Sequence, residues 1–368
     1  MKHLFLTFLN HAWRPQVQRL GRALVLGVLA LHPPAATAAG PALDIGDPAP
    51  VLHPAQWLKG TPITRFETGQ VYVIEFWATW CGPCKANIPH LTELARKYEK
   101  QVTIAGISIW ESTDPTDRAY LQKVEGFVRQ QGDKMDYLVA VDGPEGEVAK
   151  AWMVAAGEKG IPASFIVGKD GRIAWIGYPA NLGEVLQQVL EDKFDVAAAK
   201  QRRGLELKLV RPLNDAMATN DFKRALELID AILAEQPKQA PAYAYTRLIA
   251  LYHTDLEAGV ALSNQILTDA KHDIGAYRMM ASIFATQTNL PPAAYQFGQG
   301  LIDEALKKDE MKYLFLAMDA ELRANVGDRA GAVRCQEQAV AAAQKDAHAP
   351  PDFVESLKRK LARFKAAL

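Results

Sequence analysis

The sequence predicts an α/β domain followed by an all-helical domain. From residue 46 to about 192, short β-rich runs alternate with amphipathic helical patterns, as in chains whose strands share one sheet. After residue 195 the strand-like runs stop, and Ala, Leu, Glu, Lys and Gln dominate. Segments that start at 220, 254 and 288 resemble one another, which indicates an internal repeat. We expect the two domains to span 43–192 and 196–368.

Residues 1–38 predict a signal peptide. They carry four basic residues and no acidic one, then the apolar run "ALVLGVLAL" and the small-x-small sequence Ala36-Thr37-Ala38. The alternative is an uncleaved membrane anchor, but the apolar run is shorter than the ~20 residues of a spanning helix, and Arg19 and Arg22 precede it. We therefore expect a periplasmic or otherwise exported protein that is soluble after cleavage.

The composition is that of an ordinary globular protein of 368 residues, 49% hydrophobic and 23% charged. Its 42 Lys and Arg residues balance its 42 Asp and Glu residues. This balance gives no indication of nucleic acid as a partner.

The elements of the first domain follow from the residue patterns in chain order. "VYVIEFWA" predicts an apolar strand, and "KDGR" predicts the turn of a hairpin between "ASFIVG" and "IAWIGY" because Asp-Gly favours tight hairpins. The expected strands are 71–78, 102–110, 136–142, 163–168 and 173–178, and the expected helices are 81–100, 119–131, 147–155 and 182–194.

The second domain contains four similar segments, 220–233, 254–267, 288–301 and 327–340. In each, a turn residue is followed four positions later by a small residue that would let two helices approach closely: Asp221 and Ala225, Asp255 and Gly259, Asn289 and Ala293, Asp328 and Ala332. Tyr277, Ala281 and Phe284 have the spacing of the first helix of such a unit. The region 205–345 resembles a degenerate tetratricopeptide array. A generic helical bundle is the alternative.

Cys81 and Cys84 lie at the expected start of a helix. There the unpaired N–H groups and the helix dipole favour the thiolate, so the pKa of Cys81 would fall from about 8.5 to about 7. Cys84, one turn on, could then resolve a mixed disulfide, and Pro83 is tolerated in the first turn. The four-residue ring stabilises little as a structural disulfide.

A zinc site is the other alternative for this cysteine pair. Structural zinc requires a second Cys or His pair. Only His90 is near, His253 is distant, and Cys335 lies in the other domain. We expect no metal and no cofactor. We expect Cys335 to be a small buried apolar residue, and a redox-sensing role is the alternative.

Glu75 interrupts an apolar run that reads as a central parallel strand, buried on both faces. Burial without a partner would raise the pKa of this carboxyl group. Glu75 would then accept the proton that Cys84 must lose before it attacks. The alternative is a side chain at the end of the sheet, in contact with solvent.

"FWATWCGPCK" and "GIPASFIV" resemble the thioredoxin superfamily, and the extra helix and strand between "GISIW" and "EVAKAWMV" resemble the exported TlpA/ResA-like thiol-disulfide oxidoreductases. The resemblance covers residues 43–192. It implies a nucleophilic Cys81, a resolving Cys84 and a cis Ile161-Pro162 bond that faces them and holds a substrate segment. It also implies that Trp80 flanks the site.

The resemblance also bears on the direction of electron flow. Three features are similar to reducing thioredoxins: the Gly82-Pro83 dipeptide between the cysteines, the carboxyl group of Glu75, and Ile161 before the proline. We therefore expect a reductase of protein disulfides that is supplied with electrons by a membrane reductant of the DsbD type. The helical domain would bind an unknown protein. The alternatives are a thiol oxidase or isomerase, and a tetratricopeptide-type scaffold whose thioredoxin fold is redox-silent.

Overall fold

The computed structural model describes residues 42–114, 116–308 and 311–367. The predicted signal peptide, residues 1–38, lies outside this range. Among the described residues, no helix combines the length and the apolar character needed to cross a bilayer.

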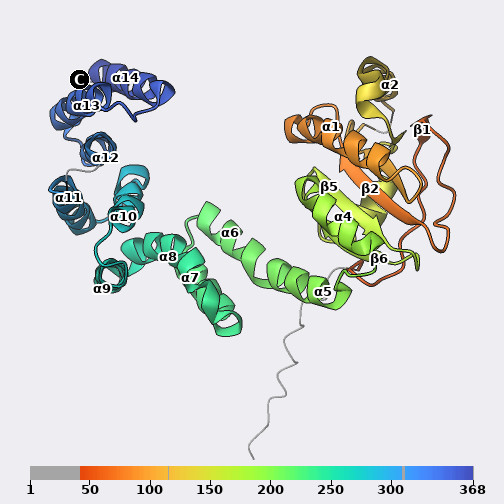
Figure 1. The fold of residues 1–368 in the computed structure, drawn as a ribbon, viewed down its shortest axis with the longest axis horizontal. Coiled ribbons are helices and arrows are strands. Elements are labelled where there is room, and N and C mark those ends of the chain that lie inside the picture. The colour runs from red at the N-terminus through yellow and green to blue at the C-terminus, as the bar shows by residue number, and fades with distance from the viewer. Residues whose placement is uncertain (1–41, 115, 309–310, 368) are drawn as a thin grey trace, which may run out of the picture. The chain divides into compact units, whose positions relative to one another are not determined.

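The first part of the chain contains one six-stranded sheet with the order β1-β4-β3-β2-β5-β6. Figure 1 labels β1, β2, β5 and β6 of this sheet. Strand β2 is central and runs parallel to β3, which is parallel to β4. On its other side β2 pairs antiparallel with β5, and β6 and β1 are antiparallel edge strands. The strands are β1 Gln56–Lys59, β2 Val71–Trp77, β3 Val102–Ser108, β4 Leu138–Val141, β5 Ala163–Val167 and β6 Ile173–Gly177.

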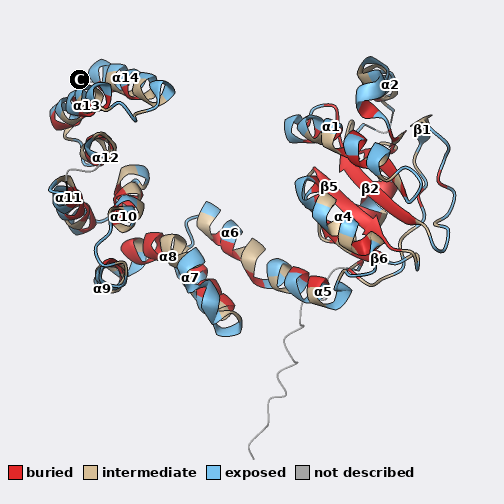
Figure 2. Cartoon of the chain, viewed as in Figure 1, coloured by how far each residue is buried: buried red, intermediate tan, exposed pale blue. Residues whose placement is uncertain are grey.

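The expected all-parallel setting of β2 is therefore wrong on one side. The hairpin β5–β6 enters the sheet beside β2 in the opposite direction, while β2 keeps its central place and every one of its residues is buried (Figure 2). The edge strand β1 was not predicted, because four partly exposed residues, "QWLK", give no strand period.

Helices cover both faces of the sheet. One core contains β2 residues Val71, Val73 and Trp77 with side chains of α1 (Gly82–Lys97), α2 (Ala119–Gln131) and α4 (Leu182–Leu190). The other contains the alternate β2 side chains with those of α3 (Glu147–Ala149) and the π-helical turn Lys150–Val154. The bounds predicted for the helix 119–131 are the same as those observed for α2. Together, α2 and β4 form the predicted helix-strand insertion between β3 and α3.

From residue 196 to residue 367, every element of the described chain is helical (Figure 1). The helices are α5 Val196–Leu205, α6 Arg211–Ala218, α7 Phe222–Glu235, α8 Ala240–Thr254, α9 Leu256–Asp269, α10 Ile274–Thr286, α11 Pro292–Leu306, α12 Lys312–Asn325, α13 Arg329–Lys345 and α14 Pro351–Ala366. The four repeat segments overlap α7, α9, α11 and α13, each of which begins two to four residues after the start of its segment.

Three of the four expected small residues are buried: Ala225, Gly259 and Ala332. Gly259 shows the reason, since a Cβ atom there would lie 2.9 Å from the ring of Tyr252 on the neighbouring helix. The three helices begin after an aspartate whose side chain accepts a backbone N–H of the first turn: Asp221, Asp255 and Asp328.

The third repeat departs from this register. Ala293 is exposed, and Ala294 and Gly298 are buried instead. The physical reason is the Pro291-Pro292 pair, which places the helix cap at Pro291 rather than at Asn289 and so rotates the helix start.

Helix α5 packs against the first part of the chain. Ala199 lies in the core on the α3 face of the sheet, and Arg203 is 4% exposed. The guanidinium of Arg203 donates to the carbonyl of Ala156 at 2.7 Å and pairs with Glu158 at 2.7 Å. Residues 196–205 thus share the core of the sheet, and the domain limits 43–192 and 196–368 stay a prediction.

Candidate active site

Cys81 and Cys84 form a disulfide at the N-terminus of α1, with Cα atoms 5.3 Å apart. Cys81 is the N-cap residue, and its Sγ accepts the backbone N–H of Cys84 at 3.1 Å. This geometry places the sulfur in the field of the unpaired N–H groups of the first turn. Once the disulfide is reduced, the same N–H groups would stabilise a Cys81 thiolate.

The residues next to the pair are open to a partner. Gly82 and Pro83 are exposed between the two buried cysteines, and Trp80 is 55% exposed. The indole N–H of Trp80 donates to the carbonyl of Trp110 at 3.0 Å, which holds the ring in place. The pair is therefore approachable from the side of Trp80, Gly82 and Pro83.

The loop before β5 faces the disulfide. The Ile161-Pro162 bond is cis, as the resemblance implies. The carbonyl oxygen of Ile161 lies 3.9 Å from Cys81 Sγ, although 80 residues separate the two in sequence. The structure thus brings Ile161 and Pro162 to the cysteine pair, and their role in holding a substrate segment stays a prediction.

Glu75 lies on β2 and is 1% exposed, with no hydrogen-bond partner in the protein for either carboxylate oxygen. Burial raises the pKa of this carboxyl group to about 8. Because side chains alternate along a strand, Glu75 shares the face of Val73 and Trp77, which is the face covered by α1 and Cys84. The solvated alternative for Glu75 is wrong.

Other buried polar groups without a partner in the protein gather on the same face. They are the Tyr137 hydroxyl, the Trp77 indole N–H and the Ser164 hydroxyl. Ser164 is the β5 partner of Glu75. The β3 partner of Glu75 is Gly106. A Cβ atom on Gly106 would lie 3.0 Å from the Tyr137 ring and 3.2 Å from the Trp77 indole nitrogen.

Tyr137 is one residue on the Glu75 face of the sheet that the sequence patterns did not indicate. Burial and, second, the charge of Glu75 raise the pKa of Tyr137 well above its ordinary value, so the hydroxyl stays a neutral donor at neutral pH. The signal was available only in part, because strand alternation gives the face of each residue but not the order of strands in the sheet.

Cys335 is not part of this site. It lies in α13, and its thiol donates to Asp319 at 3.1 Å. Burial first, then the hydrogen bond and charge of Asp319, raise the pKa of Cys335 to about 11. Within the described part of the chain, no three His, Cys, Asp or Glu side chains are grouped so that they could hold a metal ion.

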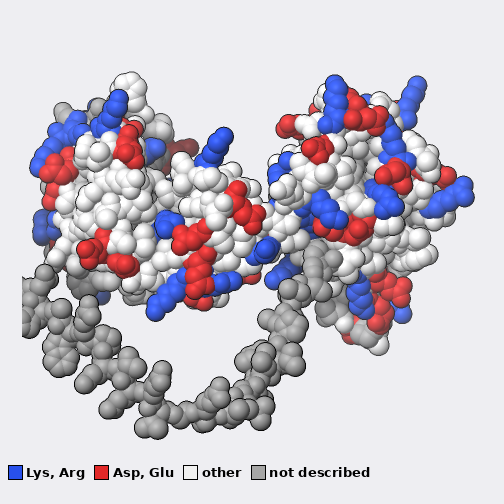
Figure 3. All heavy atoms as spheres, turned by 90° about the horizontal axis from the view of Figure 1, so that it is seen from below, with Lys and Arg blue, Asp and Glu red and all other residues white. Residues whose placement is uncertain are grey.

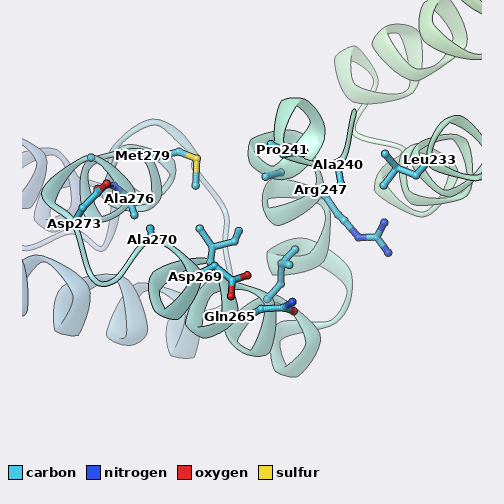
Figure 4. A pocket seen from close by; sticks show the side chains of 14 residues that line it. Leu233, Ala240, Pro241, Arg247, Gln265, Asp269, Ala270, Asp273, Ala276 and Met279 are labelled. Atoms are coloured by element: carbon cyan, nitrogen blue, oxygen red, sulfur yellow. Dashed lines mark hydrogen bonds between the residues drawn. The ribbon is translucent and has the colours of Figure 1, made fainter. Parts of the chain in front are cut away.

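The helical region contains an apolar groove of about 720 Å³ (Figure 4). Its lining side chains come from α7, α8, α9 and α10, and Met279, Ala276 and Pro241 point into it. Charged side chains also line it, among them Asp269 and Arg247. Arg247 pairs with Asp230 at 2.7 Å. On the face of the molecule seen in Figure 3, acidic and basic side chains are interspersed.

Residues 45–176 match the model of the AhpC/TSA family. The chain is 32% identical over 161 residues to the protein FixW of Rhizobium leguminosarum, a match that covers 44% of this chain and 72% of that one. It is 37% identical over 133 residues to the thiol-disulfide oxidoreductase ResA of Bacillus thuringiensis, covering 36% and 68% respectively. A crystal structure described as a thiol:disulfide interchange protein DsbE from Chlorobium tepidum matches at 27% identity over 40% of this chain and 97% of that chain, with a TM-score of 0.32. The sequence matches confirm the predicted resemblance.

Proposed function

The chain belongs to the AhpC/TSA family of thioredoxin-like proteins, and we propose that this thiol-disulfide oxidoreductase reduces disulfides in protein substrates through Cys81 and Cys84. The observation that carries the proposal is the place of Cys81. Its Sγ accepts a helix N-terminal N–H and lies opposite the Ile161 carbonyl, beside exposed Gly82, Pro83 and Trp80.

In the first step, the Cys81 thiolate attacks one sulfur of the substrate disulfide. A sulfur–sulfur bond forms between Cys81 and the substrate, the substrate disulfide breaks, and its other sulfur leaves as a thiolate that takes up a proton. The backbone around Ile161 and Pro162 would hold the substrate segment as an added extended strand.

In the second step, Cys84 loses its thiol proton to Glu75 and attacks Cys81 Sγ. The mixed disulfide breaks, the Cys81–Cys84 disulfide forms, and the substrate leaves with two thiols. Two electrons pass from the pair to the substrate. A carboxyl group with a pKa of about 8 suits this proton transfer, because an ordinary thiol has a pKa of about 8.5.

The direction of electron flow and the source of electrons extend the same proposal. The Gly82-Pro83 dipeptide and the buried Glu75 favour a reductase, in an exported protein supplied by a membrane reductant of the DsbD type. The helical region would bind a client or partner protein in the apolar groove between α7 and α10, as a tetratricopeptide-like array.

A redox titration of the mature protein, with insulin reduction as the activity, tests the proposal. We expect a midpoint reduction potential close to that of reducing thioredoxins, about −270 mV, and loss of activity in Cys81→Ser. A Cys81→Ser variant as active as wild type would overturn the proposed mechanism. A midpoint near about −120 mV would instead indicate an oxidase.

A further inference from the structure

Glu111, three residues after Ser108 at the end of β3, carries a second buried carboxylate near the cysteine pair. Its side chain is 1% exposed. One oxygen accepts the backbone N–H of Thr79 at 2.5 Å and the Ser108 hydroxyl at 2.8 Å. The other accepts the Thr79 hydroxyl at 2.7 Å and faces Lys123 Nζ of α2 at 3.3 Å. Unlike Glu75, Glu111 has a partner for both oxygens.

These contacts hold the loop that presents Cys81. Thr79 is two residues before Cys81, and the N–H of Cys81 donates to the Ala78 carbonyl at 3.1 Å. Trp80 is tied to the Trp110 carbonyl at 3.0 Å. Thr79 and Trp80 are thus connected to residues 110–111 by three separate hydrogen bonds, two of which end on Glu111.

The backbone before Glu111 is shaped for this contact. Trp110 has φ 57°, a left-handed conformation that is unfavourable for an aromatic residue. This conformation follows directly after Ile109, whose N–H donates to the Trp77 carbonyl at 2.9 Å and so continues the pairing of β3 with β2. The turn redirects the chain so that the Trp110 carbonyl meets Trp80 and the Glu111 carboxylate meets Thr79.

We propose that Glu111 is a positioning residue for thiol-disulfide exchange: it fixes the Thr79–Trp80 loop and thereby keeps Cys81 Sγ at the N-terminus of α1. This role rests on the proposed function. The 3.1 Å contact between Cys81 Sγ and the Cys84 N–H depends on where the loop ends, so a loosened loop would take the sulfur away from the groups that stabilise its thiolate.

The test measures the pH midpoint of Cys81 alkylation by iodoacetamide in the reduced full-length protein, together with the reduction potential of the pair. Glu111→Ala should raise the midpoint toward that of an ordinary thiol and slow alkylation at pH 7 about tenfold. Thr79→Val, which keeps the size and removes one donor, should slow it about threefold. Glu75, Tyr137 and Lys123 stay unchanged in both variants.

Asp142→Asn is the matched control. Asp142 is a buried carboxylate whose oxygens accept the N–H groups of Gly143, Val148 and Ala149 and have no hydrogen bond to the cysteine loop. It should lower stability without moving the alkylation midpoint of Cys81. If Glu111→Ala does not fold, Thr79→Val and Ser108→Ala carry the test, since each removes a single hydrogen bond to Glu111.

The outcomes separate the two proposals. One outcome is a low wild-type midpoint that stays unchanged in Thr79→Val and Glu111→Ala. If Glu111→Ala does not fold, Ser108→Ala takes its place in this comparison. This outcome overturns the positioning role and leaves the proposed function intact. A wild-type midpoint close to the pKa of an ordinary thiol, about 8.5, overturns the proposed function and the role of Glu111 with it. Shifted midpoints in the loop variants but not in Asp142→Asn support the role.

Discussion

The two parts of the molecule each contain a cysteine environment, and the two environments are opposite in kind. Cys81 caps a helix, accepts an N–H and lies beside exposed residues. Cys335 lies inside a helix and donates its thiol proton to the buried carboxylate of Asp319. A helix N-terminus offers donors to a sulfur anion, whereas a carboxylate repels one. We therefore expect the reactivity of the two thiols to differ because of their positions in the fold.

The largest expected effect is a difference in alkylation between these two thiols. In the reduced protein at pH 7, Cys81 should react with iodoacetamide roughly a hundredfold faster than Cys335. The thiolate fractions differ by more than a thousandfold, and the higher intrinsic nucleophilicity of the more basic thiolate offsets part of this difference. Peptide mass spectrometry after timed quenching measures both rates, and equal rates would contradict the comparison.

Glu75→Gln should slow insulin reduction at pH 8 on the order of tenfold, because glutamine cannot accept the Cys84 proton. Glu75 has a pKa of about 8, so the wild-type rate should rise as the pH increases through that value. The variant should lose this rise and keep the first step, measured as Cys81 alkylation. An unchanged pH profile would limit Glu75 to packing.

The stability of Glu75→Gln gives the control for this prediction. A raised native pKa means that the folded state holds a proton that the unfolded chain releases above about 4.5. The stabilisation from the protonated carboxyl group is full below pH 4.5 and is lost as the pH rises to about 8. In urea unfolding, the free energy of unfolding of the variant should therefore increase relative to that of wild type as the pH rises across that interval, by about 5 kcal/mol at most.

Asp319→Asn should speed alkylation of Cys335 several-fold. The change removes the acceptor charge that raises the thiol pKa, and it leaves Arg323, which pairs with Asp319 at 3.1 Å, without that partner. The rate is measured at pH 8 on native protein, with Cys335→Ala as the blank. Insulin reduction should not change, and a rate equal to that of wild type would show that burial alone protects Cys335.

The smallest expected effect concerns the apolar groove. In a Cys84→Ser background, which should trap clients as mixed disulfides on Cys81, Met279→Glu should lower trapping about threefold by placing a charge in the groove. Arg278→Glu is the matched control, because Arg278 is exposed and does not line the groove. Equal trapping by both variants would remove the groove from client binding.

Local sequence patterns predicted most of the redox part. The Asp-Gly hairpin, the bounds of α2 and the helix start at Cys81 depend on neighbours within a few residues, so a single sequence is sufficient to indicate them. Burial of Glu75 also followed, since its flanking residues are all apolar. The third repeat was misplaced by one residue at Ala293, because a proline pair changed the helix start within an otherwise regular period.

The sequence by itself was sufficient to predict which residues would carry the chemistry, because Cys81, Cys84 and Glu75 lie within one strand–loop–helix unit. Only the tertiary structure decided what surrounds them. The contacts of Glu111 with Thr79 span 32 residues, and those of Cys81 with Ile161 span 80. Such contacts depend on the order and register of strands in the sheet, which arise from packing of the whole chain and leave no periodic trace in the sequence.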